Sequence, residues 1–324
     1  MIWLTWRQLR AQAALAGAAL AFLGVLLAVT GPHLADGGDA LLGRLTETDQ
    51  TVYYVVLAAM FVLPAVIGMF WGAPLIAREL ESGTHRLAWN QSVTRTRWLL
   101  TRLSLTGLAA ATAAGLASLA VTWWSGPIDR AAAAGGSEGV DPFFPRLHPL
   151  VFAARGVVPV GVAVFAFVLG VTLGLLIRRT VPAMATALAV YVGVQFAVPV
   201  WIRPQLVPTE RTTVPVDGKG PIGVGEDSLR MALDQPGSWI TSQETLDASG
   251  HVLGSLPSSV TECTPPTPVE TCLATLTRQH YRQRITYHPA DHFWPLQWAE
   301  TALYLTLSLA LAALCVWWLR RRPA

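Results

Sequence analysis

Six long apolar runs, separated by polar stretches, dominate this chain. The hydrocarbon core of a bilayer is about 30 Å thick and needs roughly 20 helical residues to cross it. A backbone in lipid must also satisfy its own hydrogen bonds, as a helix does. The pattern therefore predicts an all-α integral membrane protein. The predicted spans are Ala11–Gly31, Val52–Ala77, Leu99–Trp124, Gly156–Ile177, Pro182–Ile202 and Pro295–Leu319.

The first ten residues, "MIWLTWRQLR", have a different pattern. Apolar residues from Ile2 to Ala13 recur every three or four positions, while Arg7 and Arg10 lie off that face. This pattern predicts a short helix lying in the membrane interface before the first span. A cleaved signal peptide is the alternative, but its apolar run is normally only about 7–15 residues long.

Arginine placement predicts the orientation of the spans. With the N-terminus inside, the inner segments hold twelve arginines and only two acids, Glu79 and Glu81. The positive-inside rule then puts both termini in the cytoplasm of a plasma-membrane protein.

The polar segment 203–294 is predicted to be an extracellular insertion between residues 1–202 and the last span with its tail, 295–324. Within it, "DSLRMALDQ" is predicted to be a helix, and "ATLTRQHYRQRITYHP" a strand or a helix. A second outer loop, Ser125–Leu147, contains "AAAAGGSEG" and is predicted to be flexible.

Composition agrees with a membrane protein, because only 13% of the residues are charged, against about 25% in soluble domains. The net charge of +3 is small. No basic cluster with interleaved aromatic residues occurs in a soluble segment, so we expect no nucleic-acid partner.

Two cysteines, Cys263 and Cys272, flank "TPPTPVET" in the outer segment. An oxidising compartment favours a disulfide between them, which would contribute about 2.5–3 kcal/mol. Free thiols or a metal pair are the alternatives, but zinc would require two further ligands. Cys315 lies in a span and is interpreted as a small apolar residue.

Catalytic motifs are missing from the sequence. The single lysine, Lys219, is followed by glycine, so no Walker-type nucleotide site is present. His288, Asp291 and His292 lie together without a nucleophile or a further ligand, which favours an interfacial loop over a metal or catalytic site. We therefore predict no enzyme activity, no metal site and no cofactor on this chain.

Glu300 is an acid about five residues inside the last span. Intramembrane acids are costly and point to function, so Glu300 is a candidate for a transport path. A carboxylate that reaches the outer headgroups is the alternative.

A polar stretch, "RELESGTHRLAWNQSVTRTRWLLTRL", separates the second and third spans. Ser82 and Gly83 interrupt the helix that leaves the second span, and Thr84 can cap a short helix. Ser92 or Thr94 can cap the next helix. The predicted form is a short helix projecting into the cytoplasm, which suits docking to a soluble partner. An ordinary positive-inside loop is the alternative.

The same stretch resembles the signature of type 2 ATP-binding-cassette (ABC) exporter permeases, in which E-x-G-T and a leucine-rich middle precede P-V-[ST]-R. The order of interface helix, six spans and outer insertion before the last span is also similar to that family, in particular to its actinobacterial members. The chain departs from the signature at Ser92, where proline is common, and at Arg102, where lysine is common. The matching residues are Glu81, Gly83, Thr84, Leu87, Val93, Thr94 and Arg95.

This resemblance implies that residues 78–98 form a coupling helix docked on a separate ABC ATPase. Two ATPase copies, which bind the ATP and Mg²⁺, would drive two permease copies, most simply a homodimer. The transport path would lie between the permeases, lined by spans one, two and five. The residues implied in docking are Glu79, Glu81, Gly83, Thr84, His85, Arg86, Leu87, Trp89 and Arg95.

The implied activity is efflux of a hydrophobic or amphiphilic substrate such as an antibiotic, peptide or lipid, with multidrug resistance as one outcome. Two alternatives remain open at the level of sequence. One is a non-transporting signalling or assembly subunit of the same fold. The other is a membrane-anchored protein whose outer segment is the active part.

Overall fold

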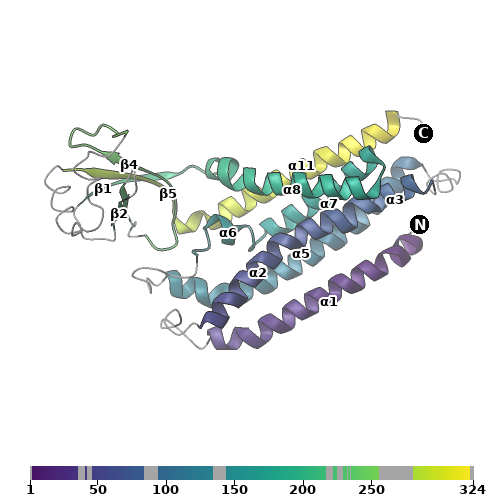
Figure 1. Ribbon diagram of the computed structural model, residues 1–324, viewed down its shortest axis with the longest axis horizontal. Helices are drawn as coiled ribbons and strands as arrows, with labels where there is room; N and C mark the ends of the chain where they lie inside the picture. The colour runs from purple at the N-terminus through teal and green to yellow at the C-terminus, as the bar shows by residue number, and fades with distance from the viewer. Residues whose placement is uncertain are drawn as a thin grey trace.

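The computed structural model describes residues 2–35, 41, 46–83, 94–133, 144–216, 222–224, 229–231, 233, 235–254 and 280–321. The molecule is elongated, with helices running side by side along its length and a β-sheet at one end (Figure 1). Both ends of the chain lie at the opposite end of the bundle from the sheet (Figure 1).

The described residues contain six helices that are long and apolar enough to cross a membrane, as predicted. Spans two, five and six are built from consecutive helical pieces, whereas the others are single helices. In chain order the spans are α1 (Ile2–Ala35), α2–η3–α3 (Glu47–Val66, Ile67–Gly72, Ala73–Glu81), α5 (Arg95–Ala133), α7 (Val158–Ile177), α8–η4–η5 (Thr180–Ala197, Val198–Ile202, Arg203–Gln205) and η6–α11 (Ala290–His292, Phe293–Arg321).

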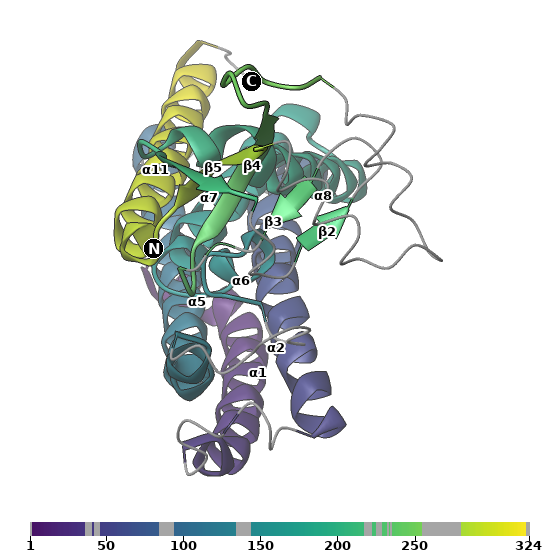
Figure 2. The same ribbon diagram turned by 90° about the vertical axis from the view of Figure 1, so that its left-hand side faces the viewer.

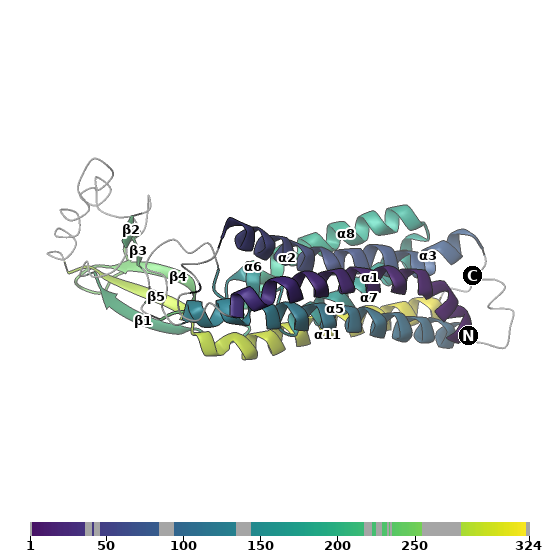
Figure 3. The same ribbon diagram turned by 90° about the horizontal axis from the view of Figure 1, so that it is seen from below.

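The centre of the bundle is α7, which contacts α2, α3, α5, α8 and α11. Its sequence, "VPVGVAVFAFVLGVTLGLLI", is apolar on every face, as expected for a helix surrounded by other helices. In Figure 3, α1 runs along one face of the bundle.

Glycines bring span two and α7 into close contact. A Cβ on Gly170 of α7 would lie 2.2 Å from the carbonyl oxygen of Gly68, and one on Gly174 would lie 2.5 Å from that of Ala73. Small residues allow membrane helices to approach this closely. Only glycine therefore fits this crossing without a shift of one helix.

Wide π-helical turns interrupt two of the three spans that the resemblance assigns to the path. In span two, η3 is followed closely by Pro74, and in span five η4 contains Pro199. Proline lacks the N–H that a regular helix requires. Such turns are frequent at functional sites.

The short helix predicted in the interface before the first span is not separated from that span, because α1 is a single helix from Ile2 to Ala35. The sequence across the expected junction, "QLRAQAALA", contains good helix formers and neither glycine nor proline. The first residues therefore continue without a break into the first candidate span, Ala14–Leu34.

The loop predicted over Ser125–Leu147 is also partly wrong, since α5 continues to Ala133. An ion pair between Asp129 of α5 and the buried Arg155 accompanies this helical extension. After residues 134–143, which lie outside the described ranges, the chain reaches the short helix α6 (Pro149–Phe152).

The segment 203–294 contains β-structure in its described residues. Strands β1 (Glu210–Pro215), β5 (Arg282–His288) and β4 (Trp239–Leu246) form an antiparallel sheet in that order, and β2 (Ile222–Val224) pairs with β3 (Leu229–Met231). The strands lie at the front of Figure 2.

The helix predicted in "DSLRMALDQ" is wrong, because β3 lies within that stretch. The stretch before the last span, left open between strand and helix, contains β5. Its buried Gln283, Ile285 and Tyr287 alternate with more exposed residues, the period of two typical of a strand.

Candidate functional site

Both edges of the polar stretch between spans two and three have the predicted breaks. The helix α3 ends at Glu81, and Gly83 has a φ of +71°, a left-handed conformation that glycine adopts without steric cost. At the other edge, the Thr94 hydroxyl accepts a hydrogen bond from the Arg97 N–H at 3.4 Å and caps α5. The chain therefore leaves and re-enters the bundle where the sequence predicted.

The middle of this stretch lies outside the described residues. Its short helix and its docking role stay predictions for Thr84, His85, Arg86, Leu87 and Trp89. Arg95, the first residue of α5, is half-buried at the end of the stretch.

Glu79 points back into the bundle. Its carboxylate lies 2.5 Å from the Arg102 guanidinium of α5, and both side chains are largely buried. Arg102 also lies over the Trp98 ring at 4.9 Å. This ion pair joins the end of span two to the start of span three. It therefore holds the two helices that flank the polar stretch against each other.

Glu81 joins the end of span two to the start of span five. One carboxylate oxygen accepts hydrogen bonds from the backbone N–H of Thr180 at 3.0 Å and from its hydroxyl at 2.7 Å. Thr180 is the first residue of α8. A negative charge at a helix N-terminus is favourable, because the free N–H groups there carry partial positive charge.

A pocket of about 540 Å³ lies between spans one, two and five. This volume falls in the range of small-molecule sites, about 300–1,000 Å³. All but two of its lining residues are apolar, and the exceptions are Arg78 and Thr180. The lining residues are Leu15, Ala16, Ala19, Leu63, Val66, Ile67, Phe70, Trp71, Pro74, Arg78, Ala113, Thr180 and Met184.

The pocket and the polar stretch share one structural connection. Thr180 lines the pocket and is held by Glu81 at the edge of the stretch. Arg78 lines the pocket one turn before Glu81. A movement of the stretch that displaced Glu81 would therefore act directly on the wall of the pocket.

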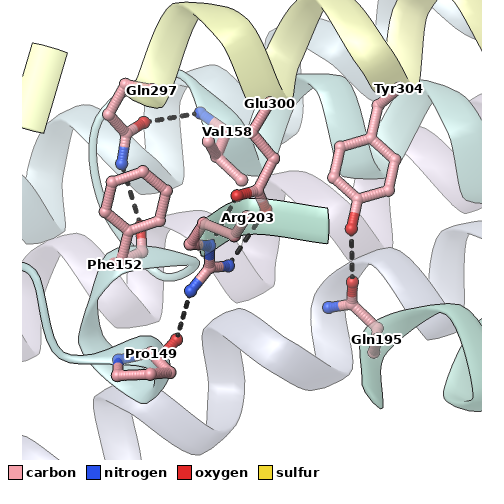
Figure 4. Close-up of polar contacts among 8 residues, drawn as sticks. All are labelled: Pro149, Phe152, Val158, Gln195, Arg203, Gln297, Glu300 and Tyr304. Atoms are coloured by element: carbon pink, nitrogen blue, oxygen red, sulfur yellow. Dashed lines mark hydrogen bonds and ion pairs between the residues drawn. The ribbon is translucent and has the colours of Figure 1, made fainter. Parts of the chain in front are cut away.

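A second polar cluster lies at the sheet end of the bundle (Figure 4). Arg203 and Glu300 form a bidentate ion pair with distances of 2.6 and 3.0 Å, and their side chains are 0% and 1% exposed. Arg203 also donates to the Pro149 carbonyl at 3.1 Å and lies over the Phe152 ring at 4.4 Å. This pair connects span five, span six and α6.

Gln297 extends the cluster from the turn of α11 before Glu300 (Figure 4). Its side-chain oxygen accepts from the N–H groups of Val157 and Val158, each at 2.9 Å, and its amide donates to the Phe152 carbonyl at 3.0 Å. The start of α7 is thus fixed to α6 and to the last span.

The burial of Glu300 excludes the alternative of a carboxylate reaching the headgroups. Its role in a transport path stays a prediction. The sequence analysis missed Arg203, although a buried intramembrane acid calls for a basic partner. Arg203 lies in the last part of span five, and Glu300 lies in the first turns of α11.

The two histidines before the last span form a pair. The Nδ1 atoms of His288 and His292 lie 3.3 Å apart, and His288 stacks on Trp239. Burial lowers the pKa of His288, and the charge of His292 lowers it further. Among the described residues, no cluster of three His, Cys, Asp or Glu side chains could hold a metal ion.

The cysteines divide between described and undescribed parts. Cys263 and Cys272 lie outside the described residues, so their disulfide stays a prediction. Cys315 is a buried free cysteine in α11, 3.2 Å from the Thr172 hydroxyl.

A family model described as "ABC-2 membrane transporter related" matches residues 12–203. The match includes spans one to five, the pocket and the polar stretch, and it ends before the β-sheet. No curated protein and no solved structure matches the chain significantly.

Proposed function

The chain belongs to the ABC-2 membrane transporter related family, and on that premise we propose that it is the permease of an ATP-driven exporter whose ATPase is a separate subunit. The permease itself carries no Walker motif, so the energy would come from that subunit. Two ATPase copies, with ATP and Mg²⁺ bound, would act on two copies of this chain.

The proposed ATPase docking site is the stretch between Glu81 and Arg95. The helices that flank the stretch are held by two contacts. Glu79 at the end of span two pairs with Arg102 of span three, and Glu81 accepts a hydrogen bond from Thr180 of span five. An ATPase that moved this stretch would therefore pull on spans two, three and five together. This role requires that the end of the bundle holding both termini face the cytoplasm.

The proposed transport path includes the pocket between spans one, two and five. Its apolar lining suits a hydrophobic or amphiphilic substrate, which would leave towards the side of the β-sheet. The single observation that carries the proposal is the Glu81–Thr180 contact, because it links the docking stretch to the pocket wall.

Gly83 provides the test of docking. Proline requires a φ near −65° and cannot adopt +71°, whereas asparagine tolerates the left-handed region. We expect an ATP-binding subunit to co-purify with the tagged wild-type chain and with Gly83→Asn, and to be lost with Gly83→Pro. Subunit composition and ATP hydrolysis of the complexes purified from membranes of the source organism measure this.

The control for folding is the size-exclusion elution profile of each permease variant in detergent. If well-folded Gly83→Pro keeps its ATPase, the docking assignment is wrong. If the wild-type chain brings down no ATP-hydrolysing subunit, the proposed function is wrong.

A further inference from the structure

We propose that the pocket between spans one, two and five binds a lipid-like amphiphile with an anionic head group, and that Arg78 is the residue that selects it. The amphiphile would come from the membrane leaflet at the α3 end of the bundle. The inference rests on the proposed function in treating the pocket as part of the transport path.

The shape of the pocket fits a molecule from one leaflet. Its lining in span two runs from Leu63 to Arg78, which is about 22 Å along a helix at 1.5 Å per residue. A bilayer with headgroups is about 40–45 Å thick, so one leaflet is about 20–22 Å. An acyl chain could therefore lie along the apolar wall with its head group near Arg78.

Charge supplies the selectivity. The exposed Arg78 guanidinium has no hydrogen-bond or ion-pair partner within the described ranges, and no acidic side chain lines the pocket there. The two nearby acids are already engaged, Glu79 by Arg102 and Glu81 by Thr180. A carboxylate or phosphate head group would supply the charge-assisted hydrogen bonds that the described residues do not give Arg78.

The head group would also lie near the proposed coupling contact. Thr180 lines the same pocket and uses its hydroxyl and N–H to hold Glu81. A ligand at Arg78 would therefore change the surroundings of the contact through which the ATPase is proposed to act.

The test uses the full-length permease alone, in nanodiscs of phosphatidylcholine. The probes are a fatty acid with a photoreactive group in its chain and the matching fatty alcohol, with oleate as competitor. We expect the acid to label peptides from the pocket wall, such as those containing Val66 or Phe70. Arg78→Gln should weaken competition by oleate about tenfold, the loss of one charged hydrogen-bond partner, and Arg78→Lys should keep most of it.

A variant that fills the pocket provides a second test. Ala16 lines the pocket and is half-buried, so Ala16→Phe should reduce labelling by the acid and the alcohol alike. Equal competition by oleate in the wild-type and Arg78→Gln chains would overturn the proposal, as would labelling confined to peptides outside the pocket.

Different results would contradict the lipid site and the proposed function. The lipid assay needs no ATPase, and ATPase retention is measured separately with the same variants. Failed labelling with a retained ATPase would contradict only the anionic site. Arg78-dependent labelling without any associated ATPase would contradict the proposed function and leave the binding site standing.

Discussion

Arg203 and Glu300 show how this protein accommodates charge within the bundle. Their bidentate contact and almost complete burial mean that each charge depends on the other. Removing one partner of a buried ion pair costs about 3–5 kcal/mol, because the remaining charge is left uncompensated. An apolar pair of similar volume often restores stability.

We therefore predict that Glu300→Ala lowers the thermal unfolding temperature of the detergent-solubilised protein markedly. The double variant Arg203→Met with Glu300→Leu should recover much of the loss. Tryptophan fluorescence during heating measures both. An unfolding temperature unchanged in Glu300→Ala would show that the pair does not hold the sheet end of the bundle together.

Sequence reasoning found Glu300 but not its partner. A single acid in an apolar run is visible locally, whereas Arg203 lies 97 positions away and meets it only when the spans pack. The same holds for Glu81, whose place in the family signature was visible but whose contact with Thr180 depends on how spans two and five approach each other.

Among the elements, span two and α7 make the most tightly constrained contact. An alanine Cβ at position 170 would lie 2.2 Å from a backbone oxygen of span two and 2.8 Å from the Ala73 nitrogen. Backbone cannot move aside as a side chain can. The helices must separate to admit even one methyl group.

Gly170→Ala should destabilise the protein by about 1–3 kcal/mol, the usual cost of overpacking. Gly193→Ala in α8 is the matched control, because its Cβ would meet nothing within 4 Å. Removing a helix glycine there should be neutral or stabilising by up to about 1 kcal/mol. Thermal unfolding of both variants gives the comparison, and equal behaviour would contradict the close crossing.

The spans were predictable because apolar length is a property of each segment alone. The sheet was not, since β3 is three residues long and lies in a stretch whose composition also suits a helix. Its conformation depends on pairing with β2 and on the hydrogen bonds of Met231 to Gln243. The continuity of the N-terminal helix with the first span was not predicted, because spacing alone does not show where one helix stops.

At the scale of the whole molecule, the proposed docking stretch and the β-sheet belong to opposite ends of the long axis. One end holds the two termini and the end of α3, where the proposed docking stretch begins, and the other holds the β-sheet (Figure 1). The Arg203–Glu300 cluster joins the last part of span five to the first part of α11. The pocket lies in the bundle between spans one, two and five. The family match ends at residue 203, so the β-sheet lies outside the matched region.

The central claim is that the stretch between Glu81 and Arg95 docks on an ATPase. Its most direct test places a photo-crosslinking amino acid at Trp89 in the full-length chain, in membranes of the source organism, with Ser242 of β4 as the control position. We expect illumination to join an ATP-binding subunit to the chain from position 89 and not from position 242. A folded chain that yields no such adduct from position 89, while an ATPase still co-purifies with it, would contradict the account.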